Sequence, residues 1–202
     1  MTLAGYATLA RLGPILTTAE AAAALRVSTS SATRLLRDLE AHSLARHVRH
    51  GVWLVGMVQP DPLSLADEIT RPYPSYVSFV SALNLHGMID QLPREITVAS
   101  LDRSKRVATE LGTYRVSHLP PELFGGWTER DGIKLATPEK ALFDIAYIGA
   151  AHGARPRRIP ELELPPAFHR SETDRWLARI PSTRLRSLTS AALAYELTRA
   201  IR

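Results

Sequence analysis

A short helix with a strong start signal, followed by a tight turn and a second helix, constrains the fold of this chain more than any other feature. Thr17 is followed three positions later by Glu20, and a hydroxyl residue with a carboxylate at that spacing forms a capping box. The pattern predicts a helix that runs to about Leu25. Four alanines, residues 21–24, allow a second helix to approach this one closely.

The segment Arg26-Val27-Ser28 predicts the turn between the two helices. In this prediction Val27 is buried and Ser28 caps a second helix, from Thr29 to about Ala41. Four apolar residues recur at helical spacing and are expected to face the core: Ala32, Leu35, Leu36 and Leu39. Two helices in this order predict a helix-turn-helix in which the second helix reads DNA.

The outer face of the second helix carries hydroxyl and guanidinium groups, contributed by Thr29, Ser30, Thr33, Arg34 and Arg37. An arginine can bind O6 and N7 of guanine in the major groove. Serine and threonine near a helix start can hold a phosphate together with free backbone amides. This face therefore predicts contact with double-stranded DNA.

Two alternating segments, residues 45–48 and 52–55, predict a pair of strands joined by a turn at His50-Gly51. With an upstream helix over residues 3–12, they complete a winged helix-turn-helix domain over residues 1–58. Basic side chains on such a wing suit phosphate or minor-groove contacts. The predicted DNA-binding residues are Ser28, Thr29, Ser30, Thr33, Arg34, Arg37, Arg46, Arg49 and His50. The alternative is that Arg34, Arg37 and Arg46 are ordinary solvated charges and that the motif serves protein contacts alone.

Charge is distributed unevenly along the 202 residues, which carry a formal net charge of +5. Residues 1–58 hold six basic and three acidic side chains, for a net +3; residues 59–154 hold nine and twelve, for −3; residues 155–202 hold ten and five, for +5. The basic start agrees with a nucleic-acid partner. The absence of cysteine excludes disulfides and thiolate zinc sites, and with no signal peptide or membrane-length apolar run it predicts a cytoplasmic protein.

A second domain is predicted over residues 62–202, because prolines punctuate the chain after the wing. Residues 75–87 have helical apolar spacing, and residues 95–99, 114–118 and 133–136 each predict a strand. Thr137-Pro138-Glu139 predicts a helix start, and two further helices are predicted over residues 171–179 and 182–201. The fold class is therefore α+β: a winged helix-turn-helix domain followed by a mixed domain with a small sheet and covering helices.

No enzyme signature is found, since a glycine-rich phosphate loop, a nucleophile elbow and a zincin motif are all absent from the sequence. His86, beside Gly87, is interpreted as a residue at a helix end. His42, His47 and His50 lack the partners of a metal site. We therefore expect no catalytic residue, no cofactor and no bound metal.

The order of several segments resembles the AbiEi-like antitoxins of type IV toxin-antitoxin systems, a family also described as abortive-infection regulators. The resemblance lies in the winged helix, then residues 76–79 running into Ser81-Ala82-Leu83-Asn84-Leu85-His86-Gly87, the strand Ile96-Thr97-Val98, and the segment 136–144. It implies that the first domain binds inverted repeats in its own promoter and represses it. It also implies that the second domain counteracts a nucleotidyltransferase-like toxin.

Two other functions stay open on the sequence. In one, the chain is a stand-alone winged-helix transcriptional regulator, and its second domain senses a ligand or forms a dimer. In the other, the second domain is a nuclease or another nucleic-acid enzyme that the winged helix brings to DNA. A neighbouring nucleotidyltransferase gene, or magnesium-dependent cleavage of a duplex, separates these possibilities.

Overall fold

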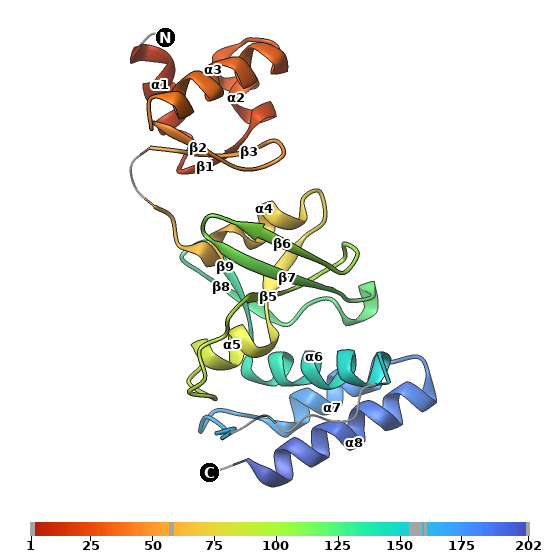
Figure 1. The fold of residues 1–202 in the computed structure, drawn as a ribbon. Helices are drawn as coiled ribbons and strands as arrows, with labels where there is room; N and C mark the ends of the chain where they lie inside the picture. The colour runs from red at the N-terminus through yellow and green to blue at the C-terminus, as the bar shows by residue number, and fades with distance from the viewer. Residues whose placement is uncertain (1–2, 57–58, 154–158, 160, 201–202) are drawn as a thin grey trace. The chain divides into compact units, whose positions relative to one another are not determined.

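The computed structural model describes residues 3–56, 59–153, 159 and 161–200, and it divides the chain into two compact units (Figure 1). The first unit extends to Glu68 and includes Thr109–Leu111, and the second contains the remaining residues. Helices and both parallel and antiparallel strand pairs occur together, so the fold is of the mixed α+β class, as predicted.

The first unit combines helices with a three-stranded sheet. Its elements are α1 (Leu3–Ala10), β1 (Ile15–Thr17), α2 (Thr18–Leu25), α3 (Thr29–Ala41), β2 (Ala45–Arg49) and β3 (Val52–Val55). β3 lies in the centre of the sheet and pairs antiparallel with β1 and β2. Leu9, Leu16, Leu36 and Trp53 are buried in the core between the helices and the sheet. The predicted helices and the two later strands are confirmed.

The predicted cap signals form the expected hydrogen bonds. The Thr17 hydroxyl accepts the Glu20 amide at 3.1 Å, and the Glu20 carboxylate accepts the Thr17 amide at 2.7 Å, so the capping box is complete. The Ser28 hydroxyl accepts the Ser31 amide at 3.2 Å at the start of α3. Both helix starts are therefore encoded locally.

Thr17→Ala is expected to lower the free energy of unfolding of the first unit by about 1 kcal/mol, because one amide at the start of α2 loses its acceptor. Urea denaturation followed by circular dichroism measures the change. Thr33→Ala is the matched control, since it makes the same substitution inside α3, where alanine favours the helix. Equal losses in the two variants would contradict the capping role of Thr17.

One expectation for this region is wrong, and one strand was not predicted. Val27 is 40% exposed and does not fill the core. Arg26 adopts a left-handed conformation (φ 54°) that ends α2, and the preceding Leu25 packs against the core instead. The strand β1 was not expected, because three residues are too few to display alternation and its pairing partner β3 lies far along the chain.

After β3 the chain forms a 3₁₀ turn (Pro62–Leu65) and the short helix α4 (Ala66–Thr70). The second sheet has six strands in the order β6-β7-β5-β4-β9-β8. These strands are β4 (Ser75–Val77), β5 (Ile96–Ser100), β6 (Lys105–Thr109), β7 (Gly112–His118), β8 (Trp127–Arg130) and β9 (Ile133–Ala136). β4 pairs antiparallel with β5 and parallel with β9, and β5 pairs parallel with β7.

Helices pack beside this sheet (Figure 1). α5 (Phe79–Leu85) and α6 (Pro138–Ala151) contact strands of the sheet, and α7 (Arg170–Ala178) and α8 (Thr183–Arg199) pack against α6. The helix predicted to begin at Thr137 is confirmed, because the Thr137 hydroxyl caps α6. The two last predicted helices are confirmed as α7 and α8.

The predicted helix over residues 75–87 is wrong in its first part. Residues Ser75–Val77 form the central strand β4, and the helix α5 begins only at Phe79. Phe79 has a positive φ of 56°, which marks a sharp change of direction between strand and helix. The apolar spacing of this segment fits either element, and only pairing with β5 and β9 makes it a strand.

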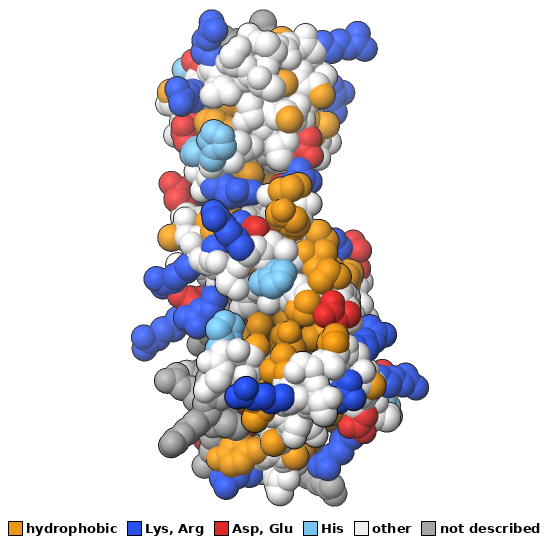
Figure 2. Space-filling view, turned by 90° about the vertical axis from the view of Figure 1, so that its right-hand side faces the viewer, with side chains coloured by type: hydrophobic (Ala, Val, Ile, Leu, Met, Phe, Trp, Pro, Cys, Tyr) orange, Lys and Arg blue, Asp and Glu red, His pale blue; other side chains and the backbone are white. Residues whose placement is uncertain are grey.

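The surface of the second unit is not uniformly polar. On the face in Figure 2, hydrophobic side chains form a band over this unit, with basic side chains beside it.

In the part of the chain that the structure describes, no helix combines the length and apolarity needed to cross a bilayer.

Candidate nucleic-acid interface

A groove in the first unit lies between α3, the start of α2 and the hairpin formed by β2 and β3. It encloses about 700 Å³. α3 contributes Thr29, Thr33, Arg37 and Glu40, and the hairpin contributes His47 and His50. The groove is thus lined by hydrogen-bonding side chains from two elements that the core holds in place.

The core fixes which face of α3 points outward. Ala32, Leu36 and Leu39 are fully buried, so the intervening residues Arg34 and Arg37 are exposed. Within residues 3–56, 59–153, 159 and 161–200, neither guanidinium has a hydrogen bond or an ion pair. Both arginines therefore present all their donors to solvent.

Hydroxyl groups gather at the start of α3. The Ser28 hydroxyl lies 2.9 Å from that of Ser30 and 2.9 Å from that of Ser31. The Thr33 hydroxyl donates to the Thr29 carbonyl at 2.8 Å, which leaves the oxygen free to accept a hydrogen bond in the groove. This end of the helix can both donate to and accept from a ligand.

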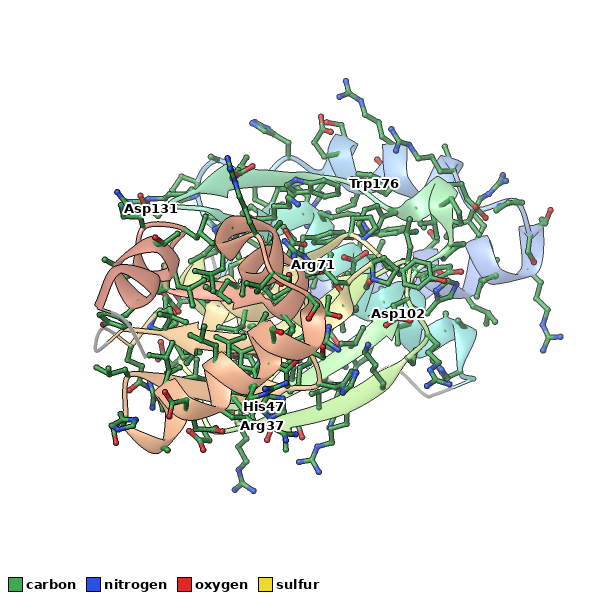
Figure 3. All side chains as sticks on the ribbon, turned by 90° about the horizontal axis from the view of Figure 1, so that it is seen from above. Arg37, His47, Arg71, Asp102, Asp131 and Trp176 are labelled. Carbon is green, nitrogen blue, oxygen red and sulfur yellow. The ribbon has the colours of Figure 1, made fainter. Side chains whose placement is uncertain are left out.

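The hairpin side of the groove is held by aromatic and polar contacts. The rings of His47 and Trp53 lie 4.7 Å apart, and the Trp53 indole donates to the Thr18 hydroxyl at 3.0 Å. The His47 amide donates to the Glu40 carboxylate at 2.9 Å. Arg37 and His47 lie next to each other in Figure 3, so α3 and the hairpin present their side chains to the same space.

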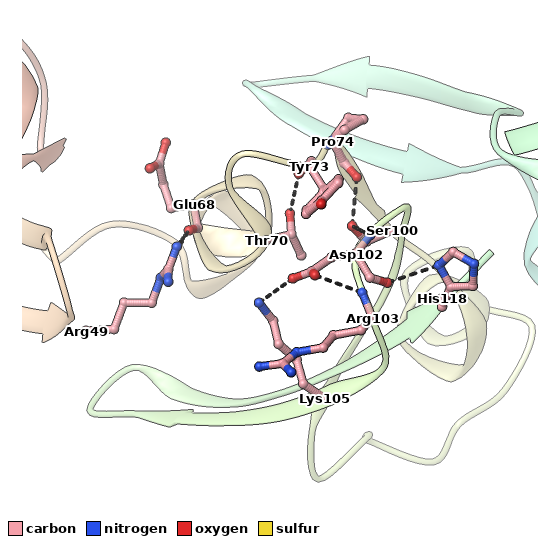
Figure 4. A network of polar contacts seen from close by, with 10 residues as sticks. All are labelled: Arg49, Glu68, Thr70, Tyr73, Pro74, Ser100, Asp102, Arg103, Lys105 and His118. Carbon is pink, nitrogen blue, oxygen red and sulfur yellow. Dashed lines mark hydrogen bonds and ion pairs between the residues drawn. The ribbon is translucent and has the colours of Figure 1, made fainter. Parts of the chain in front are cut away.

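The three predicted DNA-binding residues of the hairpin, Arg46, Arg49 and His50, differ from one another in their contacts. His50 lines the groove. Arg46 is 4.0 Å from the carboxylate of Glu110, and the Arg49 guanidinium donates to the Glu68 carbonyl (Figure 4). A ligand of Arg46 or Arg49 has to compete with these contacts, and their role in binding DNA stays a prediction.

Sequence reasoning missed several residues of the groove, among them Thr18, Glu40 and Trp53. Glu40 follows Arg37 by three positions on α3, and this spacing places two side chains on one helix face. The spacing of Arg37 and Glu40 could therefore have indicated that Glu40 shares the exposed face of Arg37. The formal charges of Arg37 and Glu40 cancel within the groove, so its affinity for an anion depends on neighbouring cations such as Arg34.

The second unit contains a buried ionic cluster that sequence reasoning also missed. Lys140 and Asp144 form an ion pair, and both side chains are fully buried. The Asp144 carboxylate also accepts the Tyr76 hydroxyl at 3.0 Å and the Ser78 hydroxyl at 2.7 Å. A lysine and an aspartate four residues apart in an otherwise apolar helix segment were the available signal.

Aromatic rings enclose the charged end of Lys140. Its Nζ lies 4.6 Å from the ring centre of Trp176 and 5.1 Å from that of Phe143. Gly126 packs so tightly here that a Cβ would lie 2.6 Å from the Trp176 ring. Burial raises the pKa of Asp144 against the effect of Lys140, and burial lowers the pKa of Lys140. The cluster is closed to solvent, so we assign it to the stability of the unit.

A second polar network lies where the parallel strands β5 and β7 end (Figure 4). The Asp102 carboxylate accepts the Lys105 ammonium and the Arg103 amide, and the Asp102 carbonyl lies 3.2 Å from Nδ1 of His118. Partial burial opposes ionisation of Asp102, but the hydrogen bonds from Lys105 and the Arg103 amide, together with the positive charges of the two side chains, outweigh burial and lower the pKa of the carboxyl group. The network closes this end of the sheet.

The described residues include no group of three or more histidine, aspartate or glutamate side chains arranged to hold a metal ion. No family model matches the chain, and no curated protein matches it.

Proposed function

We propose that the chain is a cytoplasmic, DNA-binding transcriptional regulator whose first domain, residues 1–58, is a winged helix-turn-helix. The observation that carries the proposal is the exposed face of α3, where Arg37 lines one groove with the β2–β3 hairpin and Arg34 is exposed on the same helix. In this proposal α3 enters the major groove and the hairpin is the wing. Arg34 and Arg37 donate hydrogen bonds to base edges or phosphates, and the hydroxyl groups at the start of α3 bind the phosphate backbone of the DNA.

We further propose that the regulator is the antitoxin of a type IV toxin-antitoxin system. It binds inverted repeats in its own promoter and represses it, while the second domain, residues 62–202, counteracts a nucleotidyltransferase-like toxin. The resemblance of the sequence to AbiEi-like antitoxins supports this part. The absence of an enzyme motif from the sequence agrees with a regulatory rather than a catalytic second domain.

A gel-shift titration with the DNA directly upstream of the gene tests the DNA-binding proposal. We expect binding that is tighter to this DNA than to a scrambled duplex of the same length and composition, and that weakens as salt rises because bound counterions are released. Equal affinity for the two duplexes at every salt concentration would contradict autoregulation. Co-expression of the chain with the product of the neighbouring gene tests the antitoxin role separately, with rescue of growth as the readout.

A further inference from the structure

We propose that Glu40 holds the wing, residues 45–55, at a fixed distance from α3 and so sets the sequence selectivity of DNA binding. The inference rests on the proposed function of the groove. Glu40 is a positioning residue in this proposal: it acts on DNA through the wing and reads no base.

The geometry that supports the proposal joins two elements. Glu40 lies near the end of α3, and its Oε1 accepts the backbone amide of His47 on β2 at 2.9 Å. The side chain of His47 faces the groove and packs against Trp53. One hydrogen bond thus connects the helix that carries Arg37 to the strand that carries the groove-facing histidine.

The sheet alone supports this part of the wing poorly. β2 and β3 pair regularly from Ala45 to His47, but the register shifts between His47 and Arg49. A bulge disrupts the ladder and lets the strand bend. The Glu40 carboxylate bonds the wing at the last residue before this irregularity, where an anchor from α3 has the largest effect on the direction of the hairpin tip.

The charge of Glu40 is the second observation. Its carboxylate lines the groove with Arg37, His47 and His50, where it repels the phosphates that the groove is proposed to bind. A side chain that served affinity alone would be neutral or basic here. Phosphate contacts fix the orientation of a protein on the duplex, so an anchored wing determines which bases α3 can reach.

The test compares Glu40→Gln with Glu40→Ala. Both variants remove the negative charge, but only glutamine keeps an oxygen that can accept the His47 amide. Asp38→Asn is the matched control, because Asp38 is an exposed acid of α3 that does not line the groove and lies 3.9 Å from His42. The readout is the ratio of the dissociation constants for the scrambled duplex and the upstream duplex, measured by fluorescence anisotropy.

We expect all three variants to bind the scrambled duplex more tightly than wild type, since each removes one negative charge. Glu40→Gln and Asp38→Asn should keep the wild-type ratio, whereas Glu40→Ala should lower it about fivefold, which corresponds to the loss of one hydrogen bond. Hydrogen exchange of the His47 amide should accelerate in Glu40→Ala only. Thermal melts of all variants confirm that each is folded.

The outcomes separate this inference from the proposed function. If the wild-type ratio is one, the proposed DNA-binding function fails and the inference fails with it. If wild type is selective and Glu40→Ala keeps its ratio while the His47 amide exchanges faster, the inference alone is overturned. Equal loss of selectivity in Glu40→Ala and Glu40→Gln would also overturn it, because the charge rather than the anchor would then be responsible.

Discussion

Replacing Lys140 with methionine is expected to lower the free energy of unfolding of the second unit by about 3–5 kcal/mol at neutral pH. The substitution keeps most of the side-chain volume but leaves the buried Asp144 carboxylate without the ammonium group that pairs with it. The hydroxyls of Tyr76 and Ser78 still donate to that carboxylate, yet neutral donors do not replace a cation. Urea denaturation followed by the fluorescence of Trp176, which packs on Lys140, measures the loss.

The deficit of Lys140→Met should depend on pH in a defined direction. Burial already raises the pKa of Asp144 in the presence of Lys140, and removal of the cation raises it further. A carboxyl group whose folded-state pKa is raised stabilises the fold below its unfolded pKa and loses that contribution as pH rises through the folded pKa. The loss of unfolding free energy caused by Lys140→Met should therefore become smaller as pH falls from 7 to about 4.

The matched control for this prediction is Arg175→Met, which breaks an ion pair with Glu172 on α7. That pair is exposed, with 73% and 40% of the two side chains accessible, and its loss should cost about 0.5 kcal/mol or less. A similar small loss in Lys140→Met, with no pH dependence, would show that the buried pair contributes no more than a surface one.

Arg34→Ala and Arg37→Ala are each expected to weaken binding to the upstream duplex by about 1–3 kcal/mol if the arginine reads a base. The affinity for scrambled DNA should fall less, because a base contact is lost only on the specific site. If an arginine instead binds a phosphate, both affinities should fall together and the salt dependence should become shallower. Anisotropy titrations over a salt series distinguish these two modes for each residue.

Arg11→Ala is the control for the DNA-binding variants. Arg11 is an exposed arginine of the first unit that does not line the groove. Its removal lowers the net charge equally, so any general electrostatic effect appears in all three variants. Unchanged affinity in both Arg34→Ala and Arg37→Ala would show that α3 does not face the DNA.

The helices of the first unit were predictable because their signals are local. Thr17, Glu20 and Ser28 cap within three residues of their own positions, and the buried face of α3 repeats at helical spacing. The strand β1 was not predictable, since its three residues acquire their role only by pairing with β3. The contact of Glu40 with His47 was not predictable either, because it requires β2 to pack against α3.

In the second unit, too, locally encoded features were predictable and features that depend on distant partners were not. The residues of the Thr137 cap predict the start of α6, whereas the apolar spacing of Ser75–Val77 predicts helix and its pairing partners β5 and β9 lie far along the chain. The Lys140–Asp144 pair had a visible spacing. Its burial did not follow from that spacing, because an i, i+4 pair of this kind usually lies on a solvated helix face.

The central position of β4 has a consequence for the order in which the second unit assembles during synthesis. Val77 pairs with Leu135, which the ribosome adds 58 residues later. Until β9 emerges, a nascent β4 paired with β5 keeps its other edge unpaired, and free edges invite pairing with unrelated extended chains. The sheet of the first unit, by contrast, can pair completely once Val55 has been synthesised, because all its strand pairs lie within residues 15–55.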